Sequence, residues 1–270
     1  MKTKSKIYIA LGIFVVILLG VIMLVKEAEK KAGFRTLDEI VSTGKLRVIS
    51  DNSSLGFVVK NDKISGFQYE ILKIFADSLG VELKISTSND LHECIAKLRR
   101  GKLDIVAKLV PITTEWIDVV SFTNPILVSR QMLVQRLPEN AESKFIRNQR
   151  ELANDTIFVT RNSPYRMRLK HLSCEIAAEI HVVEIENKNA EQLVKLVSEG
   201  KIRHTIVHEQ LARKITQKYH NLDASLPIGF PQTYAWIVNK KSDELLEKLN
   251  DFFANFIGST EYWNLYRKYY

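Results

Sequence analysis

Three consecutive polar side chains, Arg161, Asn162 and Ser163, stand directly before Pro164, where a helix is expected to begin. The first backbone N–H groups of a helix have no partner within it, and the positive end of the helix dipole favours an anion or a carbonyl oxygen. The segment therefore predicts a site for an oxygen-bearing ligand group. The alternative for Arg161 is a solvated loop charge.

A second polar group, Thr113 and Thr114, lies near the start of a short predicted helix and is followed by Trp116. Each hydroxyl can donate and accept a hydrogen bond, and an indole offers an aromatic face with one N–H donor. All three side chains are candidates for contact with a ligand. Packing of Trp116 at a hinge is the alternative.

His204, His208 and Glu209 raise the question of a metal. Alternate residues of a strand share one face, and imidazole is a common metal ligand. No third ligand is apparent nearby, so we expect no metal and no other cofactor.

The sequence also lacks the arrangements that nucleophilic catalysis requires. Ser163 is not in a GxSxG motif, and neither Cys94 nor Cys174 has a histidine partner in a recognisable context. The glutamates are scattered singly. We therefore expect that the chain is not an enzyme.

The composition describes a globular protein with a mild basic excess. The chain has 270 residues, of which 46% are hydrophobic, and a formal net charge of +8. The length allows one or two compact lobes. Lysines and arginines occur singly and form no dense run, which argues against a nucleic-acid partner.

Strands and helices alternate along the chain, and the alternation restarts after residue 150. This pattern is typical of βαβ units with a largely parallel sheet. In the first half we expect strands at 46–50, 81–86 and 103–109 and helices at 67–79 and 90–100. In the second half we expect strands at 156–160, 180–185 and 203–207 and helices at 164–172 and 190–197.

Two extended segments, 130–136 and 234–239, are expected to cross between the halves. They would return helices 243–257 and 260–269 to the first half. The predicted organisation is lobe 1 at 36–130, lobe 2 at 131–232 and a return to lobe 1 at 233–270. Lobes joined by two crossings can close around a ligand.

Residues 7–25 carry no charged side chain over nineteen positions. As a helix they would span about 28 Å, close to the hydrocarbon thickness of a bilayer. Lys2, Lys4 and Lys6 precede them, which places the remainder of the chain outside the cytoplasm. We expect an uncleaved anchor at 1–25 in the cytoplasmic membrane, a charged stalk at 26–35 and a domain facing the periplasm. Secretion after signal cleavage is the alternative.

The order of segments from about residue 37 onward resembles the type 2 periplasmic solute-binding proteins, the bacterial extracellular solute-binding family 3. LRVIS, SGFQYEILKIFADSLGVELKI, LRRGKLDIVAKLVPITTEWIDVVSFTNPI and LVSEGKIRHTIV match that pattern in order. The resemblance implies an α/β fold of two lobes with two hinge crossings. GFQYEI and the C-terminal segment look most like the binding domain of membrane-bound lytic transglycosylases of the F type. Their catalytic domain would begin where this chain ends, so the resemblance implies solute binding without cleavage of peptidoglycan.

The resemblance also suggests site residues and their departures. It implies that Phe57 lies against the ligand and that Glu70 is an acidic position of the site. Trp116 stands where amino-acid-binding members carry the arginine that holds the ligand carboxylate. His208 stands where they carry an aspartate for the ammonium group. Both charge partners of a free amino acid are therefore missing.

We accordingly expect a membrane-anchored periplasmic domain that recognises a small solute or a peptidoglycan-derived peptide fragment by lobe closure. One alternative is an anchored receptor of an ABC-type uptake system, beside a membrane permease. Another is a module with a degenerate cleft that binds a partner protein of the envelope.

Overall fold

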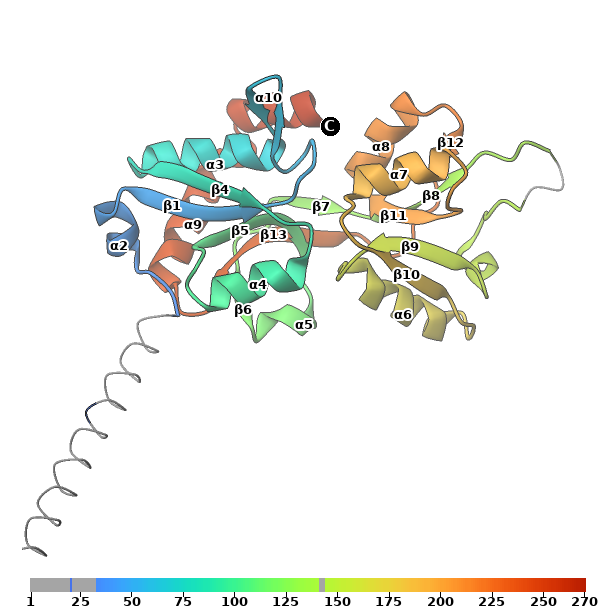
Figure 1. The fold of residues 1–270 in the computed structure, drawn as a ribbon, viewed down its shortest axis with the longest axis horizontal. Coiled ribbons are helices and arrows are strands. Elements are labelled where there is room, and N and C mark those ends of the chain that lie inside the picture. Colours follow the sequence, from blue (N-terminus) through green and yellow to red (C-terminus); the bar gives the residue numbers. More distant parts are fainter. Residues whose placement is uncertain (1–19, 21–32, 141–143) are drawn as a thin grey trace, which may run out of the picture.

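The computed structural model describes residues 20, 33–140 and 144–270 and shows two lobes side by side (Figure 1). Apart from Gly20, the predicted anchor lies outside these residues, as does the stalk up to residue 32. In the part of the chain that is described, no helix has the length and apolar character needed to cross a bilayer.

Lobe 1 contains a mixed sheet in the order β4-β1-β5-β13-β6, with β7 paired to β13. β1 runs parallel to β4 and β5, and β13 runs antiparallel to β5. Its strands are β1 (Lys45–Ser50), β4 (Glu82–Thr87), β5 (Ile105–Pro111), β6 (Val120–Phe122), β7 (Leu127–Ser129) and β13 (Gln232–Asn239). Its helices are α2 (Leu37–Ser42), α3 (Phe67–Ser78), α4 (Leu91–Arg99), α5 (Thr114–Ile117), α9 (Asp243–Phe256) and α10 (Thr260–Tyr269).

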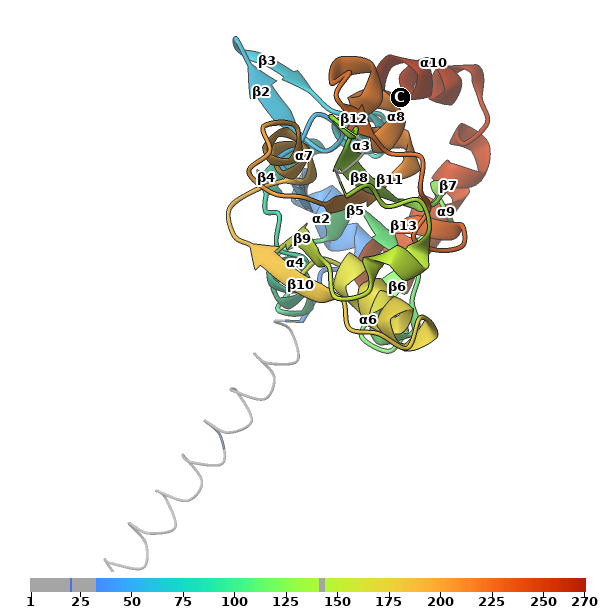
Figure 2. The same ribbon diagram turned by 90° about the vertical axis from the view of Figure 1, so that its right-hand side faces the viewer.

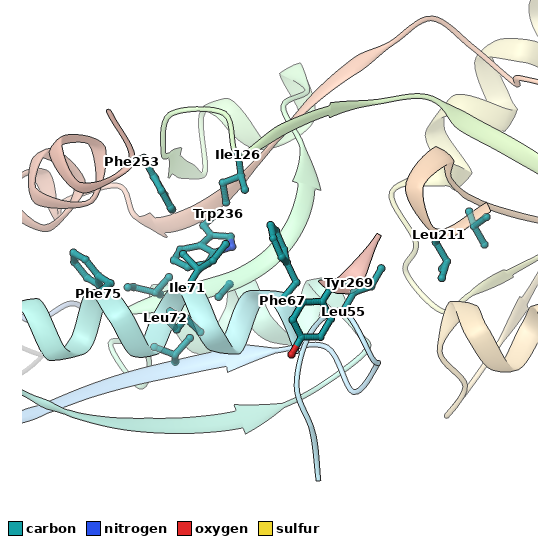
Figure 3. Close-up of a cluster of buried hydrophobic side chains, with 14 of the residues drawn as sticks. Leu55, Phe67, Ile71, Leu72, Phe75, Ile126, Leu211, Trp236, Phe253 and Tyr269 are labelled. Carbon is teal, nitrogen blue, oxygen red and sulfur yellow. The ribbon is translucent and has the colours of Figure 1, made fainter. Parts of the chain in front are cut away.

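Both faces of this sheet are buried, because successive strand residues point to opposite sides. In β1, Val48 packs with α3 and α9, whereas Ile49 packs with α4. In β13, Trp236 packs in the same core as Val48, and Ile237 packs in the same core as Ile49. Figure 3 shows Trp236 among Phe67, Ile71 and Phe253, so the helices after β13 complete the core of lobe 1, as the sequence predicts.

Lobe 2 repeats this plan around a sheet in the order β10-β9-β11-β8-β12. α7 and α8 cover one face and α6 the other, with Val207 and Ile206 of β11 on opposite sides. Its strands are β8 (Gln131–Arg136), β9 (Thr156–Thr160), β10 (His181–Ile185), β11 (Thr205–His208) and β12 (Leu222–Asp223). Its helices are the 3₁₀ turn η1 (Gln149–Leu152), α6 (Tyr165–Glu175), α7 (Ala190–Ser198) and α8 (Glu209–Lys218).

The first crossing between the lobes is shorter than predicted. Residues 130–136 were expected to form it, but β8 pairs antiparallel with β11 and belongs to the sheet of lobe 2. Gln131 to Gln135 are all buried, which an exposed connection would not allow. Arg130 alone is exposed between β7 and β8. Residues 234–239 do form a strand within β13, but β13 pairs with β5, β6 and β7 in the sheet of lobe 1, so the return crossing precedes it.

The longer predicted strands and helices are confirmed to within a few residues, but several elements are new, and two of these are larger than a single short strand or turn. One is a hairpin of β2 (Val58–Lys60) and β3 (Lys63–Ser65), which projects from lobe 1 (Figure 2). Asn61 and Asp62 form its turn with positive φ. The other is α8, which begins directly at the end of β11.

Candidate functional site

A cavity of about 130 Å³ lies between the lobes and takes its walls from both. Most of its walls come from the carboxyl ends of parallel strands and the loops and helix starts that follow, the usual place for ligands in α/β sheets. Lobe 1 contributes Asp51, Ser53, Leu55, Gln68, Asn89, Leu91, Lys108, Leu109 and Val110. Lobe 2 contributes Thr160, Asn162, Ser163, Pro164, Tyr165, Asn189, Ala190, Glu191, His208 and Leu211.

The loop after β1 is held against the start of α3 by a close backbone approach. The Gln68 N–H donates to the Leu55 carbonyl at 2.9 Å, and the Phe57 N–H donates to the Asp51 carbonyl at 3.0 Å. Gly66 has φ of 146°, and a Cβ there would lie 2.1 Å from the Gly56 oxygen. Only glycine fits this position, so Gly66 helps to fix the wall of the cavity that this loop forms.

Direct contacts hold the lobes together around the cavity. Ser54 of lobe 1 hydrogen-bonds to Glu191 of lobe 2, and Lys214 Nζ of lobe 2 lies 3.2 Å from the same hydroxyl. Asn162 Nδ2 donates to Asp90 Oδ2 at 2.8 Å across the same gap. The structure is therefore a closed arrangement of the two lobes.

Charged and polar side chains give the cavity both donors and acceptors. Asp51 and Glu191 supply carboxylates, and Lys108 supplies an ammonium group. Lys108 Nζ donates to the Ser88 carbonyl at 2.9 Å, which uses one of its three hydrogens. Such a lining can bind both the accepting and the donating groups of a polar solute.

His208 is uncharged in this environment. Its Nδ1 accepts the Leu211 N–H at 3.3 Å and so caps α8. Burial lowers the pKa of His208 from 6.5 to about 4. Burial likewise raises the pKa of Tyr165 well above its ordinary value, so both rings are neutral near pH 7.

Three of the predicted site residues line the cavity: Asn162, Ser163 and His208. They come from two different segments of lobe 2, the start of α6 and the end of β11. Asn162 has φ of 51°, and its N–H donates to Glu184 at 2.9 Å. This conformation turns the loop back at the helix start.

Phe57 and Glu70 do not line the cavity, contrary to expectation. Phe57 packs edge-on against Tyr69 with ring centroids 5.5 Å apart. Glu70 pairs with Lys268 at 2.7 Å and accepts the Tyr269 hydroxyl. It therefore fastens α10 to α3, on the outside of lobe 1.

The predicted site residues around α5, together with Arg161, also lie outside the cavity. Trp116 packs edge-on against His92 at 5.1 Å and borders the core around α4, so it packs within lobe 1. Thr113 precedes α5, and Thr114 is exposed. Arg161 is more than half exposed and pairs with Glu186, a neighbour in the same lobe.

The prediction from sequence missed most of the cavity residues, and four of them supply its charges and a buried amide: Asp51, Gln68, Lys108 and Glu191. Three of them carried a usable signal, because Asp51 follows the first predicted strand, Lys108 ends another and Glu191 opens a predicted helix. The carboxyl ends of parallel strands meet at one edge of a sheet, where binding groups gather. Gln68 had no such signal.

The two histidines considered for a metal do not share a site. His204 lies 3.5 Å from Asp155, and burial lowers its pKa, whereas His208 faces the cavity. Within residues 33–140 and 144–270 no group of three metal-ligating side chains gathers.

Comparison with known proteins gives consistent matches. The model of the bacterial extracellular solute-binding proteins, family 3, matches residues 46–270. The membrane-bound lytic murein transglycosylase F of Desulfosudis oleivorans is 26% identical over 240 residues, which cover 89% of this chain and 52% of that protein. The chain thus spans about half the length of the curated relatives it matches.

The solved structures that resemble this one include arginine-binding proteins. A mutant of ArgBP from T. maritima superposes with a TM-score of 0.74 at 26% identity, covering 86% of this chain and 98% of that one. The arginine-bound form of truncated ArgBP gives a TM-score of 0.68 at 26% identity, with coverage of 81% and 99%. The fold is that of type 2 periplasmic binding proteins.

Proposed function

Because the chain belongs to the bacterial extracellular solute-binding proteins of family 3, we propose that its interlobe cavity binds a small polar solute and that the lobes close around it. The observation that carries this proposal is the cavity itself, which both lobes line with donors and acceptors. The contacts of Ser54 with Glu191 and of Asn162 with Asp90 form only when the lobes are closed, so they support closure as part of binding.

The size of the cavity limits the solute. Its volume of about 130 Å³ is close to the roughly 150 Å³ of an engineered protein cavity that binds benzene. A small amino acid fits it, or one end of a larger solute, such as arginine or a cell-wall peptide, whose remainder lies outside. A whole disaccharide with its peptide is too large.

The charges of the cavity favour a solute with both donating and accepting groups. The chain has no arginine at position 116, and His208 is neutral, so the usual pair of charged partners for a free amino acid is missing. Asp51, Glu191 and Lys108 provide charges at other places. We therefore include peptidoglycan-derived peptides among the candidate solutes beside arginine, which is bound to ArgBP of T. maritima.

We further propose that residues 7–25 hold the domain at the cytoplasmic membrane, facing the periplasm, and that the domain binds without catalysis. The apolar run and the lysines before it support the anchor. A fixed position suits a receptor that passes a solute to a membrane partner or reports its presence. Incubation of the purified protein with peptidoglycan should release no soluble fragments.

Thermal unfolding of the full chain in detergent tests solute binding. The probes are the twenty amino acids and the murein tripeptide L-alanyl-γ-D-glutamyl-meso-diaminopimelate. A probe that binds only the folded protein raises the unfolding midpoint, and at 100 times its Kd it adds about 2.7 kcal/mol of stability. If no probe shifts the midpoint, this set of solutes is excluded.

Lobe closure is measured with two spin labels. Cys174 on α6 is exposed and Cys94 is buried, so Cys174 labels lobe 2, and a Lys102→Cys substitution labels lobe 1. A probe that binds should shift the population toward the shorter distance. Binding without any change in distance would contradict closure, whereas no binding and no change with any probe would favour the module that binds a partner protein.

A further inference from the structure

Gln68 is buried in the wall of the cavity, and its amide oxygen already accepts a hydrogen bond. The residue lies in the first turn of α3 and is 1% exposed. Its Oε1 accepts the indole N–H of Trp236 at 2.5 Å. Trp236 is itself fully buried on β13 and packs against Phe253 with ring centroids 5.1 Å apart.

This bond settles which way the amide faces. An indole nitrogen can only donate a hydrogen bond, so the atom of Gln68 beside it must be the oxygen. The amide nitrogen is then the group left over. Among the described residues, Gln68 Nε2 has no hydrogen-bond partner.

A buried N–H donor without an acceptor is costly, so such a group in a native protein calls for a specific explanation. Gln68 lines the cavity together with Lys108, another donor with hydrogens to spare. Lys108 therefore offers hydrogens to whatever occupies the cavity, and an accepting oxygen of the occupant is the group that would satisfy Gln68 Nε2. No arginine stands at position 116 to supply such donors.

We propose that Gln68 Nε2 donates to a carboxylate or carbonyl oxygen of the bound solute, and that Trp236 holds the amide in the donating orientation. The inference rests on the proposed solute binding and names the chemical group that the solute must carry. Gln68 is a specificity-determining residue: it selects solutes with an accepting oxygen near α3, and a donor at this point repels a purely cationic group.

The first test compares matched probes on the full chain by calorimetry. L-Arginine and the murein tripeptide carry carboxylates, whereas agmatine is arginine without its carboxylate. We expect a carboxylate probe to bind and agmatine to bind at least tenfold more weakly than arginine. Gln68→Met keeps the length of the side chain without a donor and should weaken the carboxylate probe about 10- to 100-fold. Gln149→Met, outside the cavity, should leave its affinity unchanged.

A second measurement uses the wild-type protein, in case Gln68→Met unfolds. With glutamine side-chain amides labelled with ¹⁵N, the Gln68 signal should move when the carboxylate probe binds. A probe that closes the lobes without moving this signal overturns the role of Gln68 and leaves the proposed function standing. If neither carboxylate probe binds, the inference fails together with that choice of solutes.

Discussion

At the scale of single residues, His208 joins a structural role to the chemistry of the cavity. Its neutral ring caps α8 through Nδ1 and lines the cavity. The folded pKa of about 4 lies below the unfolded value near 6.5, so the unfolded chain binds the proton more tightly. The stability that His208 contributes is therefore complete above pH 6.5 and is lost as the pH falls toward 4.

We expect wild-type protein to lose about 3 kcal/mol of unfolding free energy through His208 over this range. His208→Asn, which keeps a capping acceptor, should flatten the curve between pH 6.5 and 4. A smaller slope in the same direction should remain, because burial also lowers the pKa of His204. Urea unfolding at a series of pH values measures this. The exposed His220→Asn should behave as wild type, and an unchanged slope in His208→Asn would refute the assignment.

Single residues also show the limit of prediction from sequence. Asn162 and Ser163 were predicted because they precede the start of a helix, and His208 because the family resemblance aligns it with a ligand-binding aspartate. Glu70 and Gln68 lie two positions apart on α3, and residues so spaced point to different sides of a helix. Which of the two faces the cavity depends on how α3 packs, which a single sequence does not specify.

At the scale of elements, the start of α3 depends on Gly66. Its φ of 146° and the approach of the Gly56 carbonyl leave no room for a side chain. Gly66→Ala should destabilise the protein by about 3 kcal/mol, because the strained φ adds to a backbone clash. Gly80→Ala is the matched control, since Gly80 has φ of 68° with open space around it, and about 1 kcal/mol is expected. Chemical unfolding compares them, and equal losses would show that the close approach is unimportant.

The elements that the sequence predicted are those with a long periodic pattern, such as α3 and β5. β2, β3, β6 and β7 have three residues each, and β12 has two. So short a strand has no distinctive pattern and exists because a partner supplies its hydrogen bonds. The register of the partner is a tertiary property, which explains why these strands were missed.

At the scale of the whole molecule, the contacts at Ser54 are one group among the hydrogen bonds that join the lobes, which also include Asn162 with Asp90 and Asn189 with Asn52. Glu191 and Lys214 of lobe 2 both reach Ser54 of lobe 1. Removing both in Glu191→Ala/Lys214→Ala should cost the closed state about 1 kcal/mol, or about fivefold in the ratio of closed to open molecules. The distance between labels at 102 and 174 should lengthen on average, while the unfolding midpoint changes little.

Glu199→Ala provides the control for this prediction, because Glu199 pairs with Lys201 within lobe 2 and is not among the residues that line the pockets between the lobes. It removes a comparable surface carboxylate without touching the gap between lobes. If it lengthens the distance as much as the double substitution does, the Ser54 contacts are not what holds the lobes closed. The repetition of strands and helices predicted two lobes, but the contacts between them depend on loops whose conformations the sequence leaves open.

The first described residues after the predicted stalk are bonded to lobe 1, which bears on how the two lobes move. Asn239 Nδ2 donates to the Gly33 carbonyl at 2.6 Å, and Arg35 Nε donates to the buried Asp104 at 3.0 Å. If residues 7–25 are fixed in a bilayer, lobe 1 is the lobe that the chain joins to the membrane, and lobe 2 moves relative to it as the cavity opens or closes. The position of lobe 2 would then differ between the filled and the empty cavity. A membrane partner that distinguishes filled from empty receptors would have to touch lobe 2.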